Sequence, residues 1–200
     1  MRTARFGMAS MALVGCVSLG QSPPSHFFVL SATARGSATP SKGAERKEVL
    51  EVLPPRVPDY LDRPQMVIRR SSNELEVDEF NRWGEIPSAA VGRVVEENLS
   101  ALLPSWAVLP SPANPSMATR ARLFLDVEEL GWDGNGEARL KVSWSLLADG
   151  APEMQANSNL RRQARSSSPE AGAEALSELL ADLSREIAAA VAKAPLGHAH

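Results

Sequence analysis

The 200-residue sequence contains only one cysteine, few aromatic residues and no excess of positive charge. A lone cysteine excludes an internal disulfide and a cysteine-based zinc site, because both need further thiolates. The 21 Lys and Arg residues are outnumbered by 24 Asp and Glu. This balance argues against nucleic-acid binding, which depends on neutralising phosphates. Aromatic side chains make up 5% of the chain and hydrophobic residues 44%, so one mostly aliphatic core is expected.

The single cysteine, Cys16, follows a segment that is typical of an export signal. Arg2 and Arg5 precede an uncharged, mostly apolar stretch at 6–14. This stretch is too short to span a bilayer, which takes about 20 residues. Its end, Leu13-Val14-Gly15-Cys16, resembles the lipobox of bacterial lipoproteins. The alternatives are an ordinary cleaved signal and a buried N-terminal segment with an incidental cysteine.

The lipobox resemblance implies that residues 1–15 are removed as a signal peptide. It also implies that Cys16 carries a diacylglycerol and an N-acyl chain. No cofactor is expected apart from this covalent lipid. Val17 stands where an Asp would usually retain such a protein at the inner membrane, so the outer membrane is expected. Residues 16–25 then form the lipidated tether of a periplasmic domain.

The rest of the chain is predicted to form one α+β domain at 26–194, followed by a flexible tail at 195–200. Residues 32–47 have no usable period and are predicted to be a mobile loop. Alternating and helical spacing predict ten elements. The predicted strands are 26–30, 48–53, 65–70, 75–80, 106–109, 120–130, 138–146 and 153–165, and the predicted helices are 88–103 and 169–193.

The predicted architecture is a single, mainly antiparallel sheet with both amphipathic helices packed on one face, because each helix has one apolar stripe. Ser88 and Ser168 are the expected N-cap residues. The strand at 153–165 is polar, which favours an edge or an interface.

The sequence offers no catalytic constellation. Its three histidines are His26, at the start of a strand, and His198 and His200, in the tail. Chain ends usually fray, so these two are expected to be solvated rather than metal-binding. The glycine-containing stretch 133–136 lacks the Lys-Ser/Thr ending of a phosphate loop. We therefore expect neither an enzyme nor a metal site.

Residues 59–98 carry the most distinctive pattern. Its pieces are Tyr60-Leu61-Asp62-Arg63-Pro64-Gln65, Phe80-Asn81-Arg82-Trp83, Arg93 and Glu97-Asn98-Leu99. With the lipobox, this pattern resembles the PqiC family, auxiliary lipoproteins of paraquat-inducible, MCE-type intermembrane transport systems. Gly84-Glu85-Ile86-Pro87 departs from the Ala-Glu-Pro that often follows Arg-Trp in this family.

The resemblance implies an outer-membrane lipoprotein that docks a periplasm-spanning MCE tunnel and supports membrane integrity. It also implies that the protein catalyses no reaction itself. A collar for a cyclic tunnel is expected to be a homo-oligomeric ring. Two other classes stay open: a structural lipoprotein of a secretion pore or of peptidoglycan, and a lipid-binding carrier.

Six residues are candidates for the partner interface. They are Asp62, Arg63, Pro64, Gln65, Arg82 and Trp83. Arg and Trp are common in interface centres. The alternative interpretation is structural: Asp62 and Arg63 form a local ion pair, Pro64 fixes a strand entrance, and Trp83 is a lid of the core with Arg82 stacked on it or solvated.

Overall fold

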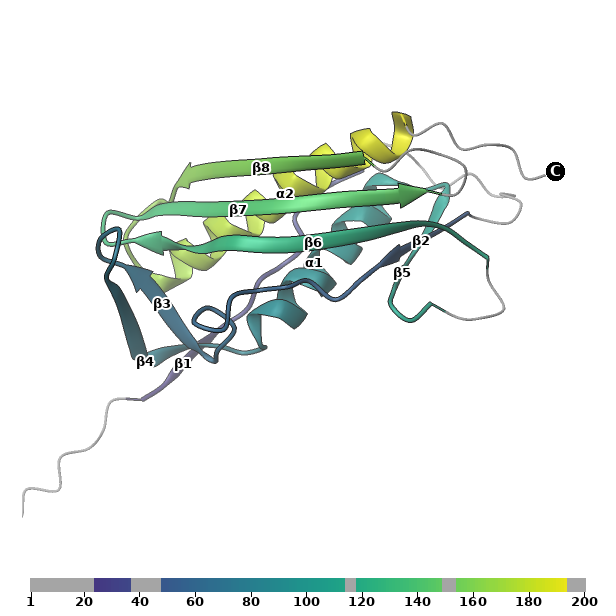
Figure 1. The fold of residues 1–200 in the computed structure, drawn as a ribbon. Coiled ribbons are helices and arrows are strands. Elements are labelled where there is room, and N and C mark those ends of the chain that lie inside the picture. Colours follow the sequence, from purple (N-terminus) through teal and green to yellow (C-terminus); the bar gives the residue numbers. More distant parts are fainter. Residues whose placement is uncertain (1–23, 37–47, 114–117, 149–153, 194–200) are drawn as a thin grey trace, which may run out of the picture.

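The computed structural model describes residues 24–36, 48–113, 118–148 and 154–193. It contains one mixed sheet of eight strands and two helices, an α+β fold (Figure 1). The predicted signal peptide at 1–15, Cys16 and the tail at 195–200 lie outside the described residues, as do all but the last two residues of the tether.

All ten predicted elements are present in the predicted order, with ends that shift by a few residues. The strands are β1 (His26–Phe28), β2 (Glu48–Val52), β3 (Gln65–Arg69), β4 (Leu75–Trp83), β5 (Trp106–Pro110), β6 (Thr119–Asp133), β7 (Glu137–Ala148) and β8 (Met154–Gln163), and the helices are α1 (Pro87–Leu102) and α2 (Pro169–Lys193).

The prediction of a mainly antiparallel sheet is wrong, since four of the seven strand pairings are parallel. The long strand β6 pairs antiparallel with β7, which pairs antiparallel with β8. Its other edge takes β2 and β3, both in parallel. β2 then pairs in parallel with β5, and β4 joins β3 antiparallel and β1 in parallel. Tight turns mark hairpins in a sequence, whereas parallel partners meet through long connections that leave no local pattern.

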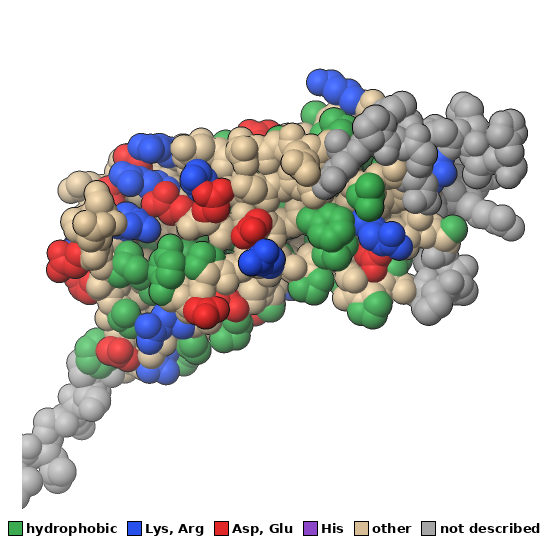
Figure 2. Space-filling model, in the orientation of Figure 1, with side chains coloured by type: hydrophobic (Ala, Val, Ile, Leu, Met, Phe, Trp, Pro, Cys, Tyr) green, Lys and Arg blue, Asp and Glu red, His purple; other side chains and the backbone are tan. Residues whose placement is uncertain are grey.

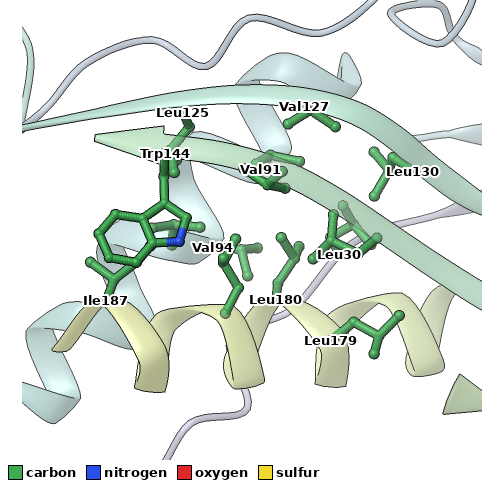
Figure 3. Packing of buried hydrophobic residues seen from close by; sticks show 14 of the residues in the cluster. Leu30, Val91, Val94, Leu125, Val127, Leu130, Trp144, Leu179, Leu180 and Ile187 are labelled. Carbon is green, nitrogen blue, oxygen red and sulfur yellow. The ribbon is translucent and has the colours of Figure 1, made fainter. Parts of the chain in front are cut away.

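Both helices lie on one face of the sheet, as predicted (Figure 1). β6 alternates as expected, with Leu123, Leu125 and Val127 buried and the residues between them exposed. Figure 3 shows Leu180 and Ile187 of α2 pointing toward the sheet. Both are fully buried. Each buried aliphatic side chain of this size stabilises the fold by about 1.5–3 kcal/mol.

The two helices begin differently. In α2 the Ala171 N–H donates to Ser168 Oγ at 3.2 Å, so the predicted N-cap is confirmed. In α1 the prediction of Ser88 as N-cap is wrong, because the helix begins at Pro87 and Ile86 occupies the cap position without a side-chain bond. The missing acceptor is supplied from a distant loop, as described below.

Candidate functional site

The six predicted interface residues lie together at one end of the sheet. Asp62, Arg63 and Pro64 form the turn that leads into β3, and Arg82 and Trp83 end β4. These six residues, Gln65 among them, are called the tether-end site below, because β1 begins beside them (Figure 1). Gln65 faces Arg82 in the β3–β4 ladder, and the Trp83 N–H donates to Pro64 O at 2.7 Å.

Asp62 supplies the cap that α1 lacks. A turn brings it into place, in which the Asp62 N–H donates to Pro58 O at 3.0 Å. Its carboxylate accepts the Ser88 N–H at 2.8 Å and the Ser88 hydroxyl at 3.0 Å. A negative charge at a helix N-terminus is also favoured by the helix dipole. Asp62 therefore uses both carboxylate oxygens on Ser88 and not on the neighbouring Arg63.

A polar chain joins the two arginines of the tether-end site. Arg63 Nε donates to Gln65 Oε1 at 3.3 Å, and Gln65 Nε2 donates to Glu79 Oε2 at 3.4 Å. Arg82 Nε donates to the Glu79 carbonyl at 3.2 Å, and its guanidinium lies 3.8 Å from the Glu79 carboxylate. Sequence reasoning missed Glu79, which partly neutralises this surface. Exposed ion pairs of this kind contribute about 0–1 kcal/mol.

Trp83 is a core residue in this structure. It is 8% exposed and meets Trp132 of β6 edge to face, with ring centroids 6.4 Å apart. Such aromatic pairs add about 0.5–1.5 kcal/mol to the effect of burial. The core-lid interpretation therefore describes its contacts, and a part for Trp83 in an interface stays a prediction.

A bulge in β4 exposes an aromatic side chain beside the tether-end site. Gln65 faces Arg82, but the next residue of β3 faces Asp78, so residues 79–81 have no partner on β3 and Phe80 is left exposed. The Asp78 carboxylate accepts the backbone N–H groups of Phe80 and Asn81 at 3.0 and 2.9 Å. Asn81 Nδ2 donates to it at 2.7 Å. Although partial burial opposes its charge, these hydrogen bonds lower the pKa of Asp78.

Two further residues of the motif fix the segment that follows β1. Arg93 of α1 donates to the carbonyl of Leu30 at 2.9 Å and to Glu85 at 2.8 Å. The hydrogen bond with Glu85 is the main reason that the pKa of Arg93 is raised. The buried Asn98 accepts the Ala34 N–H at 2.9 Å. These contacts attach the segment that follows β1 to helix α1.

The first residues of the predicted loop at 32–47 also lie against the helices. Residues 32–36 have no helix or strand, and residues 37–47 lie outside the described part. The Ser31 N–H donates to Ser177 Oγ of α2 at 3.1 Å. A Cβ at Gly36 would lie 1.9 Å from the carbonyl oxygen of Ala101, so only glycine fits there. The segment 29–36 is thus held by both helices.

The described residues contain no group of three or more His, Cys, Asp and Glu side chains that could hold a metal ion. Within the same residues, no helix is long and apolar enough to cross a membrane. His26 opens β1 and is exposed, while His198 and His200 lie outside the described part. Figure 2 shows charged and hydrophobic side chains close together on the surface at the β1–β4 end of the domain.

Residues 28–188 match the model of a family described as the ABC-type transport auxiliary lipoprotein component. The chain belongs to this family, which confirms the resemblance to PqiC-like proteins. It is a transport auxiliary family and not a known enzyme family. No curated protein sequence matches the chain.

Two crystal structures share the fold. One, of an uncharacterized protein, has a TM-score of 0.71 at 20% identity and covers 84% of this chain and 99% of its own. The other, a Xanthomonas campestris protein of the family DUF330, has a TM-score of 0.65 at 17% identity and covers 83% and 94%. At these identities the likeness supports the fold alone.

Proposed function

We propose that this protein is the outer-membrane auxiliary lipoprotein of an MCE-type intermembrane phospholipid transport system. It docks the periplasm-spanning tunnel protein at the outer membrane and so supports membrane integrity. The observation that carries the proposal is the family match over 28–188, which covers most of the chain and names a transport auxiliary lipoprotein. The protein's part is positional and not catalytic.

The anchor in this proposal is Cys16, which carries a diacylglycerol and an N-acyl chain after removal of residues 1–15. Stable attachment takes two membrane signals, and three acyl chains exceed that number. The nine residues from Val17 to Ser25 span about 30 Å when fully extended. The domain therefore stays near the membrane and faces the periplasm.

The docking surface in this proposal is the tether-end site. Arg63 and Arg82 supply donors there, and the exposed Pro64 follows Arg63 in the turn before β3. A tunnel with cyclic symmetry presents the same surface several times, so we propose that several copies of this chain form a homo-oligomeric ring around its end.

Co-purification from solubilised envelopes tests this function. The tagged full-length protein is expected to bring down an MCE-domain tunnel protein. The double variant Arg63→Ala/Arg82→Ala is expected to bring down severalfold less. Arg56→Ala is the matched control, because Arg56 is an exposed arginine that pairs with Asp126 of β6.

The proposal is wrong if no MCE protein accompanies the wild-type chain and deletion of the gene leaves the envelope barrier intact. If the double variant Arg63→Ala/Arg82→Ala recovers as much tunnel protein as the control Arg56→Ala, the tether-end site is not the docking surface. The proposed transport role would not be affected by that result.

A further inference from the structure

Four exposed hydrophobic side chains gather where the described chain begins. Phe27 is 65% exposed, Val29 58%, Phe80 44% and Ile86 41%. Phe27 faces Arg82 across the β1–β4 ladder, and Phe80 precedes Arg82 by two residues. A Cβ built on Gly84 would lie 3.1 Å from Val29, which places the segment before α1 against the end of β1. We call these four residues the apolar rim.

The exposure of the apolar rim follows from regular structure. Along β1 and the residues after it, Phe28 and Leu30 turn toward the core, so Phe27 and Val29 face outward. Phe80 is held outward by the β4 bulge, whose N–H groups are fixed by Asp78. Bulges often serve to redirect a side chain. The two phenylalanines of the rim are therefore held in place by strands β1 and β4 and not by a frayed end.

The position of the rim indicates what covers it. Val17 to Ser25 can separate Cys16 from β1 by about 30 Å at most, so the rim lies where the described domain is joined to the proposed lipid anchor. Aromatic side chains favour the membrane–water interface. Glu79 pairs with Arg82 beside the rim, so contact is expected to depend on apolar burial more than on attraction to anionic lipid.

We propose that the apolar rim inserts into the surface of the bilayer to which Cys16 is anchored, with Phe27 and Phe80 as its two aromatic contacts. This inference rests on the proposed lipid anchor. Aromatic groups at such a surface lie about 5–10 Å into the boundary between headgroups and acyl chains. The contact orients the domain, so that its β1–β4 end lies at the membrane surface, where the proposed tunnel is docked.

Fluorescence quenching by brominated lipid tests the inference on the full-length, lipidated protein. Cys16 is the only cysteine and its sulfur is occupied by the lipid, so one introduced cysteine can be labelled alone. The test variants are Phe27→Cys and Phe80→Cys. The controls are Phe124→Cys and Leu147→Cys on β6 and β7, where the native side chains are 38% and 43% exposed. Each variant receives an environment-sensitive fluorophore and is reconstituted in phosphatidylcholine vesicles with or without brominated lipid.

We expect severalfold stronger quenching at positions 27 and 80 than at 124 and 147, unchanged at high salt because charge attraction is not the cause. Equal quenching at all four positions of vesicle-bound protein would overturn the inference and leave the anchor intact. A concentration-dependent change of emission at 27 and 80 in detergent alone would overturn it in favour of a contact between copies. If Cys16 itself takes the label, the anchor fails, and this inference fails with it.

Discussion

The half of the sheet under α2 and the end of the sheet at β1 and β4 are held together by different interactions. Under α2, long strands and a 25-residue helix bury aliphatic side chains such as Leu140, Leu180 and Ile187. At the β1–β4 end, strands are short or bulged, and the carboxylates of Asp62 and Asp78 fix the backbone by accepting hydrogen bonds from its N–H groups. The difference separates a region that supplies stability from a region that presents a surface.

This division has a physical reason. Burial of apolar area is the largest favourable contribution to folding, and it needs regular elements with continuous apolar faces. A surface that meets a partner or a membrane must instead keep polar and apolar groups in water until contact. Regions with this task are held by fewer buried contacts and by local hydrogen bonds.

The largest effect is expected for truncation within the α2 half. Leu180→Ala removes a fully buried side chain and is expected to lower the free energy of unfolding by about 2–5 kcal/mol. Denaturant unfolding of the full chain measures it. Leu147→Ala is the control, since Leu147 is 43% exposed and its loss should change stability within about 0.5 kcal/mol. A smaller loss for Leu180→Ala than for the control would contradict this assignment of the core.

A smaller effect is expected at the cap of α1. Asp62→Ala leaves the Ser88 N–H without its acceptor and is expected to lower the free energy of unfolding by about 0.5–2 kcal/mol. The same unfolding measurement detects it, and Asp59→Ala provides an exposed aspartate of the same loop as control. Equal stability of the two variants would show that Asp62 does not cap the helix.

Acid should loosen the β4 bulge. The folded pKa of Asp78 lies below the value of about 3.9 that an unperturbed aspartate has. Its stabilising contribution is therefore fully present above that value and is lost as the pH falls through the lowered pKa. In an NMR titration, the amide signals of Phe80 and Asn81 should move together at this lowered pKa. Asp78→Asn should abolish the shared movement, and its persistence would exclude Asp78 as the cause.

The smallest effect on stability is expected for the apolar rim. The free energy of unfolding of the double variant Phe27→Ser/Phe80→Ser should lie within about 1 kcal/mol of the wild-type value. Surface substitutions usually change this free energy by about 0.5 kcal/mol or less each. The same variant should weaken the orientation of the domain on vesicles. A loss of stability as large as that of Leu180→Ala would place these phenylalanines in the core.

The elements could be predicted from the sequence because burial leaves a periodic pattern along the chain. The alternation through β6 and β7 and the leucine stripe of α2 record which side of each element faces the core. Parallel pairing of β2 with β5 and β6 leaves no such record, because these strands meet across long connections. For this reason the sequence predicts the elements and their order, but not which strands pair in parallel.

The candidate site shows the same limit. The resemblance singled out residues that the fold does bring together, but not the contacts they make. Asp62 caps a helix that begins 25 residues later, a partnership that no local pattern contains. The bulge at 79–81 could have been suspected, since strict alternation stops after Val77. Glu79 was missed because its importance comes only from its position between two arginines.

Both proposals depend on a lipid anchor at Cys16, and the intact mass of the protein extracted from membranes tests that anchor most directly. The mass is expected to correspond to residues 16–200 with a diacylglyceryl group and one N-acyl chain added. Cys16→Ala should remove the lipid mass and, with it, recovery from the outer-membrane fraction. A wild-type chain that carries no lipid, whether cleaved at another position or uncleaved, would contradict the account.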